Sequence, residues 1–323
     1  MKTAEKKSFS QWMRSIRGQQ ILVTVVFMVI PIALLITFTY LPLFKMAQFS
    51  FYNMKYIGTR TYIGFQNYID VFTRDDIFQA LKLSLFYLVA AIVQMALALM
   101  LAAIVTSGLR GTAFFKGAVF FPYLVCGIAV GFIFKFFFTH GFVLDTLLTH
   151  IGFQLNSLPY WLKDTSVNNS MLAATSVWRY MGQNMVLFIG AMMSVDNDVY
   201  EAAVIDGANA WQKFWSITMP GIKTMVVLNL ILSISGSISA FEPPYVITNG
   251  AFGTGTYFVI MDRIAHVNQK VGLASAMAVV LMFIIAFVTI LQKLASHFLL
   301  DEDETGRTFH ERRIAKKRSQ SAQ

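Results

Sequence analysis

A cluster of polar and aromatic side chains interrupts an otherwise apolar stretch in the middle of the chain. Arg179 lies between Trp178 and Tyr180, and Gln183 and Asn184 follow about one helical turn later. Aromatic rings beside groups that donate and accept hydrogen bonds are suited to a ligand that carries many hydroxyl groups. In the alternative interpretation this end of the stretch lies near a membrane surface, where Arg179 extends its charge toward water and Trp178 joins an interfacial belt of aromatic residues.

A second group of polar residues surrounds a pair of prolines. Glu242 stands directly before Pro243 and Pro244, which should interrupt a helix at that point. Within a membrane, an interrupted helix exposes its backbone only where it lines a cavity. The candidates for a transport pathway here are Ser235, Ser239, Glu242 and Tyr245. Helix capping or packing also accounts for them, and Asn229 in the same stretch contacts either a ligand or, more ordinarily, a neighbouring helix.

No pattern of catalytic or metal-binding residues accompanies these groups. The five His residues are scattered, H-E-x-x-H and G-x-S-x-G are absent, and the single cysteine, Cys126, lies in an apolar run. We therefore predict a chain that is not an enzyme, with no metal ligand and no cofactor of its own. The phosphate-binding pattern G-x-x-x-x-G-K-[ST] is also missing, so an ATP-driven process would need ATP and Mg²⁺ bound by another chain.

The composition indicates what must position these residues. Of 323 residues, 56% are hydrophobic and 13% are charged, whereas soluble domains carry about 25% charged residues. The mean hydropathy is +0.58. The net charge of +9 does not indicate nucleic-acid binding, because the basic residues gather at the two ends and around the apolar segments. The chain is therefore predicted to be a multi-pass protein surrounded by membrane lipid.

Six apolar stretches are each long enough to cross the ~30 Å core of a bilayer as a helix. None alternates with a period of two residues, so the fold class is predicted to be an all-α membrane protein with about six transmembrane helices. The predicted spans are Ile21 to Phe44, Leu83 to Thr106, Phe114 to Phe138, Met171 to Ser194, Met225 to Tyr245 and Val271 to Ser296.

The distribution of Lys and Arg predicts the orientation of these spans. One side of the predicted membrane carries sixteen of these residues and the other nine. The richer side faces the cytoplasm, so both termini and the loop between the fourth and fifth spans are predicted to be cytoplasmic. Residues 1–20 and 297–323 are assigned to cytoplasmic tails, and the loops after the first, third and fifth spans to the outer side.

The cytoplasmic loop from Asp198 to Pro220 is predicted to form a hairpin of two short helices. Asp198 is expected to cap the first helix, with Glu201 at the third position of a capping box. Gly207 permits the turn between the helices, and Pro220 is expected to stop the second helix before the next span.

The outward faces of this hairpin are predicted to be apolar or small. A short amphipathic element in the cytoplasm fits a groove on another protein, although a helix lying on the membrane surface gives the same pattern. The outward-facing residues are Ala202, Ala203, Ile205, Ala208, Trp211 and Phe214.

The residue types and spacing of the hairpin resemble the EAA loop of ABC importer permeases. The one departure is Met219 where that family usually has Leu, a change that conserves volume. The matching positions are Glu201, Ala202, Ala203, Asp206, Gly207, Ala208, Ile217, Met219 and Pro220. The segment from Phe65 to Tyr68, Trp178, and the segment from Gly272 to Ala276 narrow the resemblance to the sugar-permease branch, over roughly Ile21 to Leu294.

This resemblance implies a type I ABC importer permease fold over residues 21–296, with residues 198–220 as the loop that couples to an ATPase. It further implies a second permease subunit, two ATPase subunits that bind ATP and Mg²⁺, an extracytoplasmic solute-binding protein, a carbohydrate substrate and the bacterial cytoplasmic (inner) membrane.

The alternative is an ion-coupled secondary transporter of a small polar solute, which should show membrane-embedded carboxylates or inverted repeats. Only Glu242 lies near a span, and no convincing repeat is present. An intramembrane hydrolase or transferase lacks paired catalytic groups in this sequence.

Overall fold

The computed structural model describes residues 16–107 and 110–300 of the chain, and this part is built almost entirely of helices. The first helix begins at Ile16 and the last ends at Leu300. Most of the two predicted cytoplasmic tails therefore lies outside the described residues.

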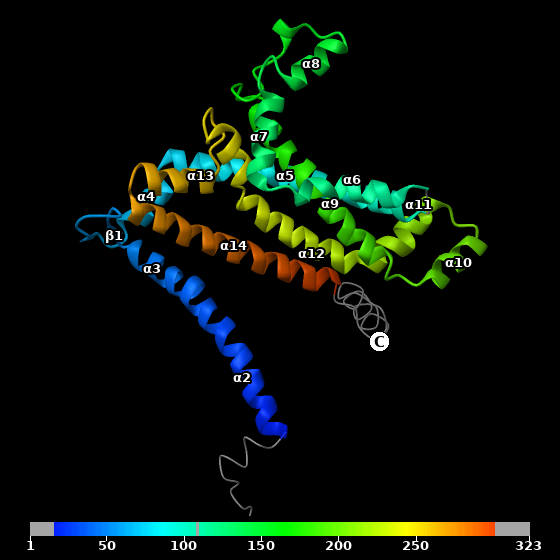
Figure 1. The fold of residues 1–323 in the computed structure, drawn as a ribbon, viewed down its shortest axis with the longest axis horizontal. Helices are drawn as coiled ribbons and strands as arrows, with labels where there is room; N and C mark the ends of the chain where they lie inside the picture. The colour runs from blue at the N-terminus through cyan, green and yellow to red at the C-terminus, as the bar shows by residue number, and fades with distance from the viewer. Residues whose placement is uncertain (1–15, 108–109, 301–323) are drawn as a thin grey trace, which may run out of the picture.

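The N-terminal helix stands apart from the rest of the molecule. It consists of α2 (Ile16–Leu35), a π-helical turn (Ile36–Tyr40) and α3 (Leu41–Phe49). In Figure 1, α2 extends away from all the other helices, and α3 connects it to them. The apolar stretch of this helix has no buried residue, so the rest of the described chain does not cover it. Its surface is suited to lipid or to a second protein chain.

Four long helices form the main bundle (Figure 1). They are α5 (Asp75–Thr106), α9 (Asn168–Met192), α12 (Met219–Ile238) and α14 (Val271–Leu300). Ala98 and Ala102 of α5 are fully buried in one cluster with Met185 and Phe188 of α9. Small residues on one helix allow the larger side chains of its neighbour to approach closely.

A small cap lies where α5 and α14 begin. It contains β1 (Tyr52–Asn53), β2 (Thr61–Tyr62) and α4 (Gln66–Thr73). The two strands pair antiparallel, with Tyr52 opposite Tyr62. Asn67 donates hydrogen bonds to the carbonyls of Ser50 and Tyr52, at 2.8 Å and 3.0 Å, and so ties α4 to the strand.

The third predicted span is broken into two helices. It consists of α6 (Thr112–Leu124) and α7 (Gly127–Phe138), which meet at an angle of 97°. Pro122 removes a backbone donor near the end of α6, and Val125 and Cys126 then adopt extended conformations. In Figure 1, α7 leaves the bundle and carries α8 (Val143–His150) at its far end. A 3₁₀ turn, Leu155–Ser157, follows before the chain returns to α9.

The fifth predicted span also ends earlier than expected. We predicted a helix as far as Tyr245, but α12 ends at Ile238, ahead of the two prolines. A π-helical turn (Pro244–Thr248), α13 (Tyr257–Asp262) and a second π-helical turn (Arg263–Val267) follow. The predicted interruption at the prolines is therefore confirmed, and it begins within the serine-rich end of the helix.

Among the described residues, four helices are long and apolar enough to cross a membrane, or five if α6 and α7 form one broken span. The set comprises the N-terminal helix, α5, the helix that ends in α12, and α14. Although α9 has the length, its polar cluster keeps it out of this set. The structure thus has several membrane-spanning helices, and a count of six stays a prediction.

Candidate functional site

A cavity of about 440 Å³ lies between α5, α9, α12 and the segment that follows α12. This volume falls within the range of ordinary ligand sites, about 300–1,000 Å³. Its wall is formed by Tyr87, Ala90, Ala91, Gln94, Ser176, Tyr180, Gln183, Asn184, Leu187, Asn229, Leu232, Ser233, Gly236, Ser237, Ser239, Ala240, Phe241, Glu242 and Pro243. The structure therefore brings together six of the predicted pathway residues, namely Tyr180, Gln183, Asn184, Asn229, Ser239 and Glu242.

Amide side chains are the main polar feature of this wall. Asn184 and Asn229 are both buried, and their Nδ2 atoms have no hydrogen-bond partner in the described part of the chain. The hydroxyl of Tyr87, also buried, lacks a partner in the same sense. Tyr87 and Gln94 belong to α5, and the sequence analysis did not predict them as site residues. Two polar side chains within an apolar span could have indicated them.

Arg179 and Glu242 form an ion pair beside this cavity. Arg179 Nη1 donates to Glu242 Oε2, which joins α9 to the segment after α12. The Arg179 side chain is 15% exposed and that of Glu242 is 43% exposed. The guanidinium also lies over the ring of Tyr180, with Cζ 5.1 Å from the ring centroid. A charge within a predicted span needs either a partner or water, and the structure gives Arg179 a partner in Glu242.

Two glycines of α7 make room for this arrangement. A Cβ atom on Gly127 would lie 2.5 Å from Arg179 Nη1, and one on Gly131 would lie 2.5 Å from Val246 Cγ1. The α7 backbone therefore packs directly against the ion pair and the turn after it. This close approach explains the spacing of the two glycines.

Four predicted pathway residues do not line the cavity. Trp178 packs edge-on against Phe134 of α7, with ring centroids 5.2 Å apart, and Tyr245 stacks on Phe241 at 4.6 Å. Ser235 of α12 is likewise absent from the wall, and Arg179 lies behind Glu242.

The predicted hairpin forms at the opposite end of α12. It consists of α10 (Asn197–Ile205), α11 (Ala210–Lys213) and a π-helical turn (Phe214–Thr218) that continues into α12. Gly207 separates the two helices with φ +78°, which confirms the expected turn.

Two details of the hairpin differ from the prediction. The cap of α10 is Asp196, whose side chain accepts a hydrogen bond from the backbone of Asp198 at 3.1 Å. Asp198 is therefore inside the helix, where its charge still favours the positive end. Pro220 does not stop a helix either, because the helix runs from Ala210 to Ile238. The widened π-helical turn ahead of Pro220 accommodates the proline ring.

The hairpin exposes apolar side chains, as predicted for Ile205 and Trp211. Ile205 is 86% exposed, and Val204 and Trp215 are exposed beside it. We call Val204, Ile205, Trp211 and Trp215 the hairpin patch. Phe214 instead packs into the bundle core.

A hydrogen bond connects α10 to the base of α12. It joins the Tyr200 hydroxyl to Thr218 Oγ1 at 2.9 Å. This bond links the first hairpin helix to the helix that lines the cavity.

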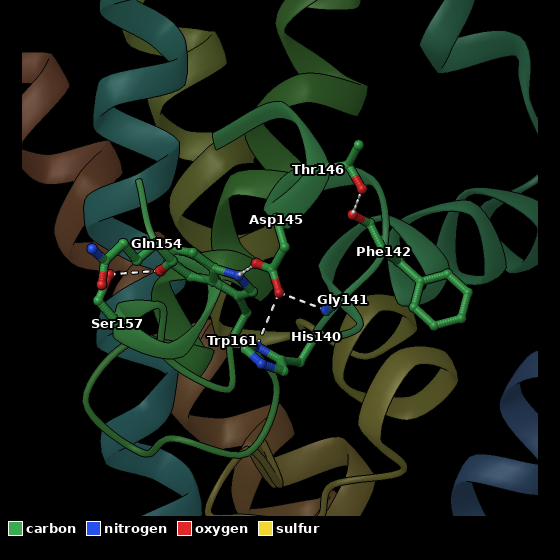
Figure 2. A network of polar contacts seen from close by, with 8 residues as sticks. All are labelled: His140, Gly141, Phe142, Asp145, Thr146, Gln154, Ser157 and Trp161. Atoms are coloured by element: carbon green, nitrogen blue, oxygen red, sulfur yellow. Dashed lines mark hydrogen bonds and ion pairs between the residues drawn. The ribbon is translucent and has the colours of Figure 1, made fainter. Parts of the chain in front are cut away.

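A polar network holds the segment between α7 and α9 together (Figure 2). Asp145, only 1% exposed, accepts hydrogen bonds from Trp161 Nε1 and from the backbone N–H of Gly141, both at 2.6 Å. His140 Nδ1 lies 2.9 Å from the same carboxylate, and its ring lies 4.4 Å from that of Tyr160. We call these side chains the Asp145 network. Nothing in the spacing of these residues predicted it.

These features define a multi-pass helical membrane protein with a polar cavity among its spans, which is the architecture of a transport permease. The chain belongs to the family of binding-protein-dependent transport system inner membrane components, whose family model matches residues 94–299.

Individual relatives agree with this membership. The chain is 28% identical to the multiple sugar-binding transport system permease protein MsmF of Streptococcus mutans, over 84% of this chain and 94% of that protein. It is 29% identical to the probable starch degradation products transport system permease protein AmyD of Thermoanaerobacterium thermosulfurigenes, over 76% and 83%.

A solved structure shares the fold. A chain of a bacterial ABC transporter involved in the import of the acidic polysaccharide alginate superposes with a TM-score of 0.79 at 17% identity. The match covers 88% of this chain and 98% of that one.

Proposed function

We propose that this chain is the permease subunit of an ATP-driven ABC importer, and that it passes a carbohydrate from an extracytoplasmic binding protein across the membrane. The observation that carries this proposal is the amide-lined cavity between α5, α9 and α12 in a chain of this family. Groups that both donate and accept hydrogen bonds match a ligand rich in hydroxyls. Relatives named for multiple sugars and for starch degradation products support the same substrate class.

Energy is supplied, in this proposal, by separate ATPase subunits that engage the hairpin. The hairpin patch offers them an apolar contact, and α11 continues without interruption into α12, which lines the cavity. The coupling positions are those from Glu201 to Pro220 that match the EAA loop. ATP and Mg²⁺ bind to the ATPase subunits, and this chain supplies no catalytic group.

A second permease subunit completes the pathway on the side that the bundle leaves open. The N-terminal helix supports this pairing, because it leaves its own bundle without burying its apolar surface. The whole complex lies in a bacterial cytoplasmic membrane. The hairpin and both termini face the cytoplasm, and the Asp145 network and the cap around β1 face outward.

Reconstitution of the complete transporter in proteoliposomes tests this function. With the binding protein present, uptake of a radiolabelled oligosaccharide should require ATP on the hairpin side and should not respond to a proton or sodium gradient. Uptake driven by such a gradient without ATP would favour the secondary-transporter alternative and overturn the proposal.

A matched pair of substitutions tests the coupling loop. Gly207→Val places a β-branched residue at positive φ, which costs about 1–2 kcal/mol and distorts the turn. We expect uptake to fall while ATP hydrolysis persists. Gly207→Asn is the control, because Asn tolerates this backbone conformation, and it should retain coupled uptake. Equal uptake by the two variants would contradict the role of the hairpin.

A further inference from the structure

We propose that the cavity selects uncharged carbohydrates, and that the pairing of Arg179 with Glu242 is the feature that sets this selectivity. The inference rests on the proposed function and refines its substrate class. The shared fold does not determine the charge of the sugar, because related folds serve different ligands.

The cavity wall carries a single ionisable carboxylate and no basic group. Apart from Glu242, the described residues of the wall are tyrosine, amide, serine and apolar side chains. Arg179 lines only a smaller neighbouring pocket, which it shares with Glu242. The negative charge of Glu242 on the wall is therefore balanced by Arg179, which lies outside the wall.

The side chains of Arg179 and Glu242 differ in their exposure to solvent. Glu242 is 43% exposed, whereas Arg179 is 15% exposed. A ligand in the cavity consequently meets the carboxylate before the guanidinium. Like charges repel strongly where water is scarce, so a uronate faces an unfavourable approach. An uncharged sugar loses nothing, because it leaves the pair intact.

The ion pair cannot easily release its guanidinium to an acidic ligand. Separating two partly buried charges leaves each without compensation. The α7 backbone at Gly127 also packs against both side chains and leaves no space for a side chain of its own. Arg179 is thus held in a structural role on the far side of Glu242.

The uncharged groups of the wall provide the recognition instead. Asn184 and Asn229 leave their amide nitrogens without a partner in the described structure, which burial disfavours. A sugar hydroxyl can accept from an amide N–H and donate to an amide oxygen. The same groups give a uronate no positive charge to offset its own.

A binding measurement on the complete transporter tests this selectivity. The transporter, with both permease and ATPase subunits but without the binding protein, is placed in lipid nanodiscs. The probes are two radiolabelled panels of matched length, neutral di- to tetrasaccharides and the corresponding uronates. We expect the wild type to retain members of the neutral panel and to bind each uronate at least tenfold more weakly than its neutral counterpart.

Charge variants identify the residues responsible. Glu242→Gln leaves Arg179 uncompensated and should improve uronate binding relative to neutral binding at least tenfold. The double variant Arg179→Gln/Glu242→Gln carries neither charge, so its neutral preference should lie between that of the wild type and that of Glu242→Gln. The swap Arg179→Glu/Glu242→Arg keeps an ion pair, so it guards against misfolding, and it should invert the preference because the guanidinium now occupies the wall.

A second ion pair provides the control. Arg74 and Asp76 pair at 2.7 Å at the start of α5 and do not line the cavity. Arg74→Gln/Asp76→Asn should leave the ratio of neutral to uronate binding unchanged.

Three results would overturn the inference. They are equal binding of the two panels by the wild type, a binding ratio unaffected by both Glu242→Gln and the swap, and binding of neither panel. The proposed function is judged separately by the ATP dependence of uptake in proteoliposomes.

Discussion

The Asp145 network and the cavity wall differ in whether their buried polar groups have hydrogen-bond partners. The buried carboxylate of Asp145 meets Trp161, Gly141 and His140 within one short segment (Figure 2). The wall of the cavity holds buried amides whose nitrogens have no partner in the described structure. A closed network of this kind stabilises a local fold, whereas open groups cost stability and serve a ligand. Substitutions that remove polar groups should therefore have opposite effects in the two regions.

Removal of the Asp145 carboxylate should give the largest effect. Asp145→Ala leaves the Trp161 and Gly141 donors without their buried acceptor and removes the carboxylate beside His140, which costs about 3–5 kcal/mol. We expect the segment from Thr139 to Val167 to become sensitive to limited proteolysis. Asp164→Ala is the control in the same segment, because within the described residues the Asp164 carboxylate accepts hydrogen bonds from Ser166 alone, at the surface. Similar protease resistance in Asp145→Ala and the wild type would show that the network does not hold the segment.

A milder change in the same network should give a smaller effect. Trp161→Phe keeps an aromatic side chain but replaces the indole by a smaller phenyl ring without the Nε1 donor, whose bond to a carboxylate contributes about 1.5–3 kcal/mol. The measurement is the temperature at which the segment becomes accessible to protease in detergent. Tyr160→Leu, which removes a ring packed on His140 but no donor to Asp145, should lower this temperature less. The reverse order would mean that ring packing, not the carboxylate, organises the segment.

The glycine beside the ion pair should be the next most sensitive position. Gly127→Val inserts atoms where Arg179 and Glu242 pack, and such overpacking costs about 1–3 kcal/mol. The expected result is a lower melting temperature of the purified complex together with altered sugar binding. Gly117→Val on α6 is the matched control, since a Cβ there meets nothing within 4 Å. Equal melting temperatures for the two variants would contradict the close packing of α7 on the pair.

The sequence predicted those parts of the site that depend on local signals. Gly207 indicated a turn because only a residue without a side chain adopts positive φ freely, and the turn is present. The polar cluster after Arg179 and the Pro243-Pro244 interruption were also visible locally, and both border the cavity.

Contacts between distant segments could not be predicted in this way. Arg179 and Glu242 are 63 residues apart, and they meet because α9 packs against α12 and because α7 packs against α9 and the turn after α12. The helix cap illustrates a smaller difficulty. Asp196 and Asp198 are both acceptable caps by residue type, and the path of the chain from α9 decides in favour of Asp196. Pro220 was misjudged because the effect of a proline depends on the turn before it, and here that turn is π-helical.

The smallest change in stability should come from the cavity, and its direction differs from that in the Asp145 network. Asn229→Leu replaces an amide by an apolar side chain of similar size. Because the amide nitrogen has no partner among the described residues, stability should change by less than about 1 kcal/mol or rise. Sugar binding should weaken at the same time, because a donor and an acceptor are lost from the wall.

Leu232→Met, at another position of the same wall, is the control and should preserve binding. The two measurements are the melting temperature of the complex and equilibrium binding of the neutral panel. A large loss of stability in Asn229→Leu, with binding unchanged, would place Asn229 in a closed network like that of Asp145 and remove the distinction between the two regions.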